Sequence, residues 1–144
     1  MAIAMSHIGI SVANLERSIA FYRDVFEMEL MERENFGGAL YERILALSGT
    51  SGKVALLQRG SIQIELFEFV QPSPKKASPS RPVCDHGITH FCIEVDDIEI
   101  LYNHMKMAGV HFHCPPLEFP GAVKATYGRD PDGNVFELLE ISRK

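Results

Sequence analysis

One stretch of the sequence decides the fold, because the chain contains it twice: Thr89-His90-Phe91-Cys92-Ile93-Glu94-Val95-Asp96-Asp97-Ile98-Glu99. The other copy lies 83 residues earlier (90 − 7) and reads Ser6-His7-Ile8-Gly9-Ile10-Ser11-Val12-Ala13-Asn14-Leu15-Glu16. In each copy a histidine opens a short apolar run, an Asp or Asn follows, and an amphipathic helical pattern begins. The whole run aligns without a gap.

A second pair of matching segments follows in the same order. Ile64-Glu65-Leu66-Phe67-Glu68 corresponds to Phe136-Glu137-Leu138-Leu139-Glu140, with an offset of 72 residues (137 − 65). Two linked segments repeated in one order indicate a duplicated supersecondary unit. Each unit therefore has one strand led by a histidine and one strand with a central glutamate.

Composition limits the possible functions. A chain of 144 residues is long enough to form one compact domain with a substantial core, here residues 1–144. The net charge of −5 argues against a nucleic-acid partner, which would need a basic face. The three cysteines show no C-x-x-C spacing, the segment 1–5 lacks the features of a signal peptide, and no apolar run reaches membrane-spanning length. We predict a cytoplasmic protein with reduced thiols and no membrane association.

The first half predicts a β-α-β-β-β order. Asn14 is placed to cap a helix whose apolar residues recur at helical spacing from Leu15 to Phe26. Residues 49–52 predict a turn. The expected strands are 7–12, 28–34, an extended piece at 41–47, and a hairpin of 54–58 with 62–70.

The second half predicts the same order after a Pro/Ser-rich linker at 71–86. The two modules are then residues 5–70 and 87–142. Asp97 is placed to cap the second helix and Gly109 to end it. The expected strands are 88–95, 110–113, 123–128 and 134–141, with a loop at 115–121.

Strand alternation places histidine and glutamate side chains on equivalent faces of the two modules. His7 shares a face with Gly9 and Ser11, and His90 shares the equivalent face with Cys92 and Glu94. Glu65 and Glu137 each lie within an apolar strand, where a carboxylate is costly unless it is paired or bound to a metal. The four residues with these properties are predicted to form one metal site: His7, Glu65, His90 and Glu137. Imidazole and carboxylate ligands suit Zn, Ni, Co, Mn or Fe, and the sequence does not choose among these divalent ions.

These motifs resemble those of the vicinal oxygen chelate superfamily, which includes glyoxalase I, methylmalonyl-CoA epimerase, extradiol dioxygenases and drug-resistance proteins. The resemblance covers nearly the whole chain. It lies in the His-Ile-Gly-Ile-Ser-Val run from His7, Ile-Glu-Leu at 64–66, Thr-His at 89–90, and Asp-Pro-Asp-Gly-Asn-x-x-Glu-Leu at 130–138. It implies an α+β fold of two tandem βαβββ modules that form a cup-shaped mixed sheet, and a homodimer.

The resemblance also implies a function. In bacterial glyoxalase I the positions matching His7, Glu65, His90 and Glu137 bind the metal. Keeping all four favours a metal-dependent isomerase, epimerase or lyase that moves a proton next to a chelated carbonyl of a small molecule. Glu65 and Glu137 are the two candidate bases. Two alternatives remain open: a non-haem iron(II) dioxygenase, and a metal-free binding protein of the drug-sequestering kind.

Other residues suggest the kind of substrate. Ser11 and Phe69 stand where bacterial glyoxalase I has an arginine and an asparagine, and Glu94 would repel an anion. We therefore predict a small neutral or hydroxylated carbonyl compound rather than a glutathione or coenzyme A adduct. The side chains expected to line the cup or contact the substrate are Ser11, Phe67, Phe69, Cys92, Glu94, Phe112, Tyr127 and Arg129.

The remaining polar residues receive structural interpretations. Glu68 and Glu140 are expected to be charges on edge strands facing solvent. His86 is expected in the linker, and His111 and His113 have no counterparts in the first module. None of these five residues is predicted to bind the metal.

Overall fold

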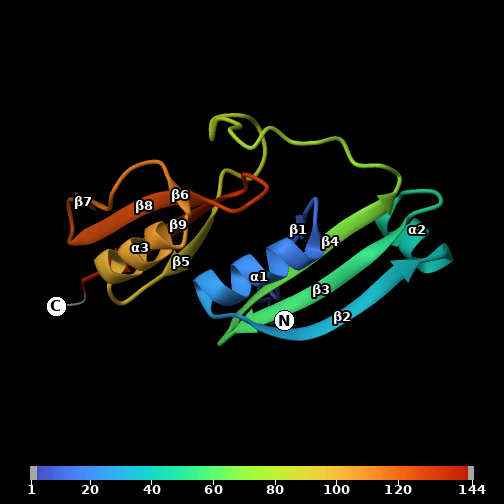
Figure 1. Ribbon diagram of the computed structural model, residues 1–144, viewed down its shortest axis with the longest axis horizontal. Coiled ribbons are helices and arrows are strands. Elements are labelled where there is room, and N and C mark those ends of the chain that lie inside the picture. Colours follow the sequence, from blue (N-terminus) through green and yellow to red (C-terminus); the bar gives the residue numbers. More distant parts are fainter. Residues whose placement is uncertain (1–2, 143–144) are drawn as a thin grey trace. The chain divides into compact units, whose positions relative to one another are not determined.

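The computed structural model describes residues 3–142 and divides the chain into two compact units (Figure 1). The first unit extends to Lys76 and the second begins at Ala77. This division lies inside the Pro/Ser-rich segment that the sequence predicts as a linker.

The first unit is a four-stranded sheet with a helix packed on it. The strand order is β1-β4-β3-β2, and only the β1–β4 pair is parallel. The helix α1 packs mainly on β3 and β4. The elements are β1 (Ile8–Ser11), α1 (Leu15–Phe26), β2 (Glu29–Gly37), α2 (Ala39–Leu45), β3 (Ser51–Arg59) and β4 (Ile62–Gln71).

The second unit repeats this topology. Its order is β5-β9-β8-β6, with β7 also paired to β8, and again only the first pair is parallel. The elements are β5 (Phe91–Glu94), α3 (Ile98–Met107), β6 (His111–Phe112), β7 (Leu117–Phe119), β8 (Val123–Arg129) and β9 (Val135–Ile141). The predicted duplication and the α+β class are confirmed, with one sheet in each unit.

The two faces of the first sheet differ in character. Ile64 and Leu66 of β4 are fully buried on the side that packs against α1. The apolar stripe of α1 that the sequence predicts from Leu15 to Phe26 is buried as well. Glu65 and Phe67 alternate with these residues and therefore occupy the opposite face.

The predicted helix ends are confirmed. The side chain of Asn14 accepts a hydrogen bond from the backbone N–H of Arg17 (2.9 Å), and Asp97 accepts one from Ile100 (2.9 Å). Gly109 follows α3 with a φ of +87°, a left-handed conformation that suits glycine at this position. Capping side chains therefore mark both helix starts, and the backbone freedom of glycine marks the end of α3.

The prediction of an extended piece at 41–47 is wrong, because residues 39–45 form the short helix α2. Ala, Leu, Glu and Arg in this segment favour a helix. The helix begins after Gly38, whose φ is +83°. Tyr41 holds it to β2 by donating a hydrogen bond to Glu34 (2.9 Å) and packing its ring on Phe36.

The prediction of a loop at 115–121 is also wrong in part, because it contains β7. Both β6 and β7 pair with β8 and occupy its outer edge, at the place that β2 occupies in the first sheet. Pro115 and Pro116 lie between the two short strands and cannot donate to the ladder. The duplicated edge strand is thus interrupted rather than lost.

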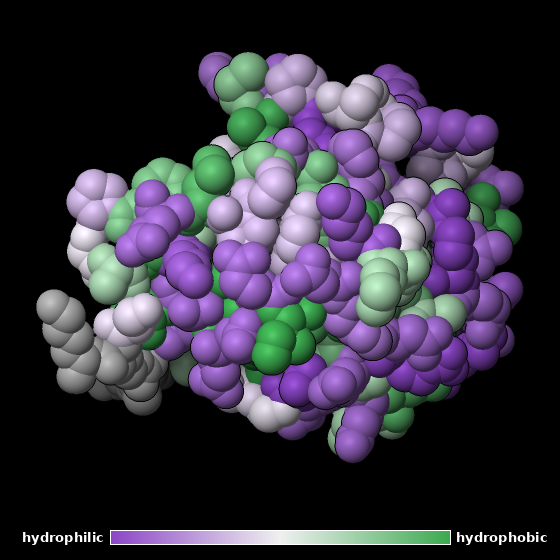
Figure 2. Space-filling model, turned by 60° about the vertical axis from the view of Figure 1, so that its left-hand side comes forward, coloured by the Kyte–Doolittle hydropathy of each residue, from purple (hydrophilic) through white to green (hydrophobic). Residues whose placement is uncertain are grey.

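Polar and charged groups predominate on the surface seen in Figure 2, and hydrophobic groups appear there in small separate patches. Several exposed apolar side chains, such as Leu40 and Ile44 of α2, project from individual elements. Scattered exposure of this kind is normal for proteins. Within residues 3–142 no helix has the length and hydrophobicity needed to cross a membrane.

Candidate metal centre

The first unit brings His7 and Glu65 together. His7 lies just before β1, and the parallel register places Gly9 of β1 beside Glu65 of β4. The His7 Nε2 atom lies 3.3 Å from the Glu65 Oε2 atom. Both side chains remain partly exposed, at 42% and 30%. An imidazole nitrogen and a carboxylate oxygen therefore meet at an accessible point of this face.

The second unit brings His90 and Glu137 together in the same way. His90 lies just before β5, and Cys92 of β5 pairs with Glu137 of β9. The His90 Nε2 atom lies 2.9 Å from the Glu137 Oε2 atom. These side chains are less exposed than the first pair, at 24% and 16%. Each unit thus brings together one histidine and one glutamate of the predicted four-residue set.

Each histidine also has a hydroxyl partner that sequence reasoning missed. His7 Nδ1 lies 3.3 Å from Ser6 Oγ, and His90 Nδ1 lies 2.9 Å from Thr89 Oγ1. A partner on Nδ1 orients the ring and leaves Nε2 for the carboxylate or a metal. The sequence could have predicted these partners, since a hydroxyl residue precedes the histidine in both copies of the repeat.

Cys92 and Tyr127 flank Glu137 in the second sheet, because both pair with it across the strands. The Tyr127 ring lies 4.7 Å from the His90 ring, centroid to centroid. Partial burial, then the charge of Glu137, raises the pKa of Tyr127. Although Cys92 is exposed at the surface, partial burial of its thiol and then the charge of Glu137 raise its pKa to about 12. Both groups therefore stay protonated beside Glu137 at neutral pH.

Ser11 and Glu94 occupy equivalent positions in their strands. Ser11 pairs with Phe67 of β4, and Glu94 pairs with Leu139 of β9. Both are exposed. Each pairs with the residue two positions after the glutamate of its unit's His–Glu pair, on the same face, as strand alternation predicts.

An aromatic cluster lies on the Glu65 face of the first sheet. The Phe67 and Phe69 rings stack at 5.8 Å, and the Phe36 ring meets both edge-on at 5.4 and 5.3 Å. Tyr41 of α2 extends the cluster, and its pKa is raised by the hydrogen bond to Glu34, by burial, and by the charges of Glu34 and Glu65. The predicted apolar lining at Phe67 and Phe69 therefore lies beside Glu65, and Tyr41 is an addition that the sequence did not predict.

Phe112 does not belong to this lining. Its ring packs on Tyr102 of α3 at 4.8 Å and on Phe136 at 5.9 Å. Phe112 pairs with Gly128, one residue out of phase with Tyr127. It therefore faces the helix, and its predicted place in the cup is wrong.

Arg129 makes three hydrogen bonds within the second unit. Its guanidinium donates to His113 Nε2 (3.0 Å) and to the carbonyl oxygens of Gly133 (2.9 Å) and Arg81 (2.9 Å). These bonds tie the segment before β5 to the turn before β9. A role of Arg129 in binding substrate stays a prediction, and it would compete with these contacts.

The contact with Arg129 predicts a pH dependence. Burial, then the charges of Arg129 and His111, lowers the pKa of His113 below its ordinary value of about 6.5. The neutral ring therefore stabilises the folded unit above about pH 6.5, and this contribution is lost as the pH falls through the lowered pKa. We expect an NMR titration midpoint for His113 below 6.5, and a His113→Gln variant whose stability deficit narrows between pH 7 and pH 5. A midpoint at or above 6.5 contradicts this account.

Glu68 and Glu140 are not the solvent-facing edge charges that the sequence suggested. Glu68 Oε2 accepts a hydrogen bond from the backbone N–H of Leu15 (2.6 Å), and Glu140 Oε2 accepts one from Ile98 (2.9 Å). The prediction failed because β4 and β9 are interior strands of their sheets. Each glutamate instead satisfies the first N–H of its own unit's helix.

The donor set of each pair fits a metal ion. Nitrogen from imidazole and oxygen from carboxylate are the ligands of many zinc, nickel, cobalt, manganese and iron sites. Among residues 3–142 no group of three or more His, Cys, Asp or Glu side chains is close enough together to hold a metal ion. Each pair supplies two donors, so the predicted four-ligand site requires both pairs.

The fold and these paired residues define a glyoxalase-like class of protein. A sequence profile of the Glyoxalase/Bleomycin resistance protein/Dioxygenase superfamily matches residues 4–138, and the chain belongs to this superfamily. A solved glyoxalase family protein from Bacillus cereus superposes with a TM-score of 0.87 at 22% identity, covering 97% of this chain and 95% of that one. The fosfomycin resistance protein FosX from Listeria monocytogenes superposes with a TM-score of 0.66 at 19% identity, covering 97% and 94%. At these identities the two structures show the shared fold alone.

Two characterised relatives are enzymes by name. A 2-epi-5-epi-valiolone epimerase from Actinomyces sp is 26% identical over 73% of this chain and 58% of its own length. The lactoylglutathione lyase GLX1 of Arabidopsis thaliana is 28% identical over 93% of this chain and 43% of its own length. The chain therefore spans about half the length of these relatives. Enzymes that carry out epimerase and lyase chemistry thus occur among its relatives.

Proposed function

We propose that the protein is a divalent-metal-dependent isomerase, epimerase or lyase that transfers a proton next to a carbonyl group of a small molecule. One observation carries the proposal: two equivalent His–Glu pairs, with Nε2–Oε2 distances of 3.3 and 2.9 Å, recur in the two units. A duplicated pair of this composition is difficult to explain as two separate core contacts, because all four side chains keep some exposure.

In this proposal His7, Glu65, His90 and Glu137 together bind one divalent ion, within one chain or between two chains of a homodimer. The bound ion would supply Lewis acidity that polarises the carbonyl and acidifies the adjacent C–H. Ser6 and Thr89 hold the two imidazole rings so that Nε2 faces the carboxylates. Names of relatives that denote an epimerase and a lyase support this reaction type.

Glu65 and Glu137 are the candidate bases. A carboxylate beside a polarised substrate can accept the proton from carbon and return it to the same or a neighbouring atom. Tyr127 lies next to His90 and pairs with Glu137, and in this proposal its protonated hydroxyl donates a hydrogen bond to a substrate oxygen. The equivalence of the units leaves both glutamates in the proposal.

The proposed substrate is a small neutral or hydroxylated carbonyl compound. Ser11 and Glu94 offer hydrogen-bonding groups beyond the ligand pairs, and the Phe67–Phe69 stack lies beside Glu65. The carboxylate of Glu94 disfavours an anionic thioester at this position. The epimerase relative is named for a valiolone, and the ending of that name denotes a ketone, which agrees with the proposed carbonyl compound.

The test is proton exchange in D₂O. With added Zn²⁺, Co²⁺, Ni²⁺ or Mn²⁺, the protein is expected to introduce deuterium next to the carbonyl of polyhydroxy ketones, measured by ¹H NMR. Glu65→Gln or Glu137→Gln should abolish exchange, whereas the surface variant Glu118→Gln should retain it. Preferred turnover of the glutathione hemithioacetal of methylglyoxal contradicts the substrate class. Oxygen uptake with catechols after anaerobic loading with iron(II), without any deuterium exchange, would instead support the dioxygenase alternative.

A further inference from the structure

The two strands that follow the histidines are short and weakly anchored by burial. β1 and β5 contain four residues each, and within them only Ile10 is buried. The side-chain period of a strand is two, so a shift of one residue moves every side chain to the other face. A shift of β1 against β4 would therefore turn His7 away from Glu65, and the same holds for β5, His90 and Glu137.

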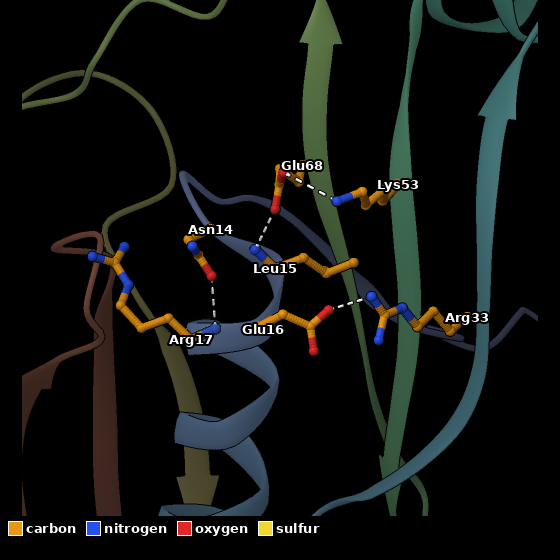
Figure 3. Close-up of polar contacts among 7 residues, drawn as sticks. All are labelled: Asn14, Leu15, Glu16, Arg17, Arg33, Lys53 and Glu68. Carbon is orange, nitrogen blue, oxygen red and sulfur yellow. Dashed lines mark hydrogen bonds and ion pairs between the residues drawn. The ribbon is translucent and has the colours of Figure 1, made fainter.

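Each short strand is followed by a duplicated backbone bond to its partner strand. The Val12 N–H donates to the Phe67 carbonyl oxygen at 2.8 Å, and the Val95 N–H donates to the Leu139 carbonyl oxygen at 2.8 Å. Beyond these bonds, the carboxylates of Glu68 and Glu140 accept from the first N–H of the following helix. Figure 3 shows the Glu68 carboxylate reaching from β4 to the start of α1 at Leu15.

These glutamates differ from the ordinary helix caps beside them. Asn14 and Asp97 accept from N–H groups three residues further along the same segment. Glu68 and Glu140 instead bond to backbone groups 53 and 42 residues away in the chain. Each bond runs from the strand that carries Glu65 or Glu137 to the helix that follows the histidine strand of the same unit. A carboxylate at a helix N-terminus makes a charge-assisted bond that also complements the helix dipole.

We infer that Glu68 and Glu140 are positioning residues that fix the register of each histidine strand against its glutamate strand. Glu68 lies three residues after Glu65 and therefore on the opposite face, as Glu140 does relative to Glu137. Neither touches the His–Glu pair of its unit. Their effect passes through the backbone: they hold the end of the histidine strand, and this keeps the Nε2 atom beside the carboxylate. The expected effect on metal binding rests on the proposed function, whereas the effect on strand register does not.

The first test needs no metal. Amide hydrogen exchange at Val12 is expected to be about tenfold faster in Glu68→Ala than in the unmodified protein, since a charge-assisted bond is lost. Asn14→Ala is the matched control, because it removes a cap from the same helix but no link to β4, and Val12 should keep its exchange rate. Glu68→Gln, whose amide oxygen can still accept from Leu15, should restore most of the protection. The pair Glu140→Ala and Asp97→Ala repeats the comparison at Val95.

The second test uses Co²⁺ as the probe. We expect Glu68→Ala to bind Co²⁺ about tenfold more weakly than the unmodified protein, the lower end of the effect typical for groups that orient metal ligands. Asn14→Ala should bind within about twofold of it. If the Val12 amide exchanges at the same rate in Glu68→Ala and Asn14→Ala, the register role is wrong. The register role is also wrong if Glu68→Ala shows faster Val12 exchange but binds Co²⁺ as tightly as the unmodified protein. If the unmodified protein binds no Co²⁺, the proposed function fails, and the exchange comparison alone decides the register role.

Discussion

His90→Ala and Glu137→Ala are each expected to weaken divalent-metal binding by at least about a hundredfold and to abolish turnover. Groups that merely orient a metal ligand contribute about ten- to a hundredfold to affinity, so loss of the ligand itself should exceed that range. In each variant the remaining partner of a 2.9 Å contact also loses its counterpart. Isothermal titration with Co²⁺ and Zn²⁺ measures the effect.

The controls for this prediction come from the same unit. His111→Ala removes an exposed imidazole from β6, and Glu118→Ala removes an exposed carboxylate from β7. Both should bind metal as the unmodified protein does. Equal affinities of His90→Ala, His111→Ala and the unmodified protein would show that His90 is not a ligand.

Gly52→Ala is expected to destabilise the first unit by about 3 kcal/mol. An added Cβ at this position would overlap the Glu68 carbonyl oxygen and lie 2.7 Å from two atoms of the Phe36 ring. The carbonyl belongs to the β3–β4 pair, next to a register shift between Ser51 and Gly52, so it cannot move without disturbing the ladder. Urea unfolding followed by circular dichroism measures the loss.

Gly9→Ala is the matched control for this substitution. Gly9 lies in β1 of the same sheet, and an added Cβ there would have no atom within 4 Å. Its stability should stay within about 0.5 kcal/mol of the unmodified protein. Equal destabilisation by the two substitutions would contradict the close approach at Gly52.

Features encoded by short-range sequence patterns were predictable. The internal repeat predicted that His7 is equivalent to His90 and Glu65 to Glu137, because the same two segments recur in the same order in both units. The caps at Asn14 and Asp97 were also predictable, since capping depends on a side chain and an N–H three residues apart. Both kinds of feature depend on local chemistry or on duplication, and both are visible in a single sequence.

Helix α2 was missed although its composition favours a helix and its Tyr41 contacts the nearby Phe36 and Glu34, because the second unit has no counterpart for this helix. Features that depend on long-range contacts were not predictable. Gly52 was predicted as a turn residue, but it lies within β3 where a ring and a carbonyl approach the backbone. Glu68 and Glu140 were misjudged because their helix partners are 53 and 42 residues away.

Metal content of the freshly purified, unmodified protein tests the central claim most directly. Elemental analysis, followed by Co²⁺ titration of the chelator-treated protein, should give about one divalent ion for each set of four ligands. The double variant His7→Ala/His90→Ala should retain none. If the purified protein carries no metal and does not bind added metal, the account is contradicted and a metal-free binding protein is favoured. Tight metal binding by the double variant would contradict the proposed ligands.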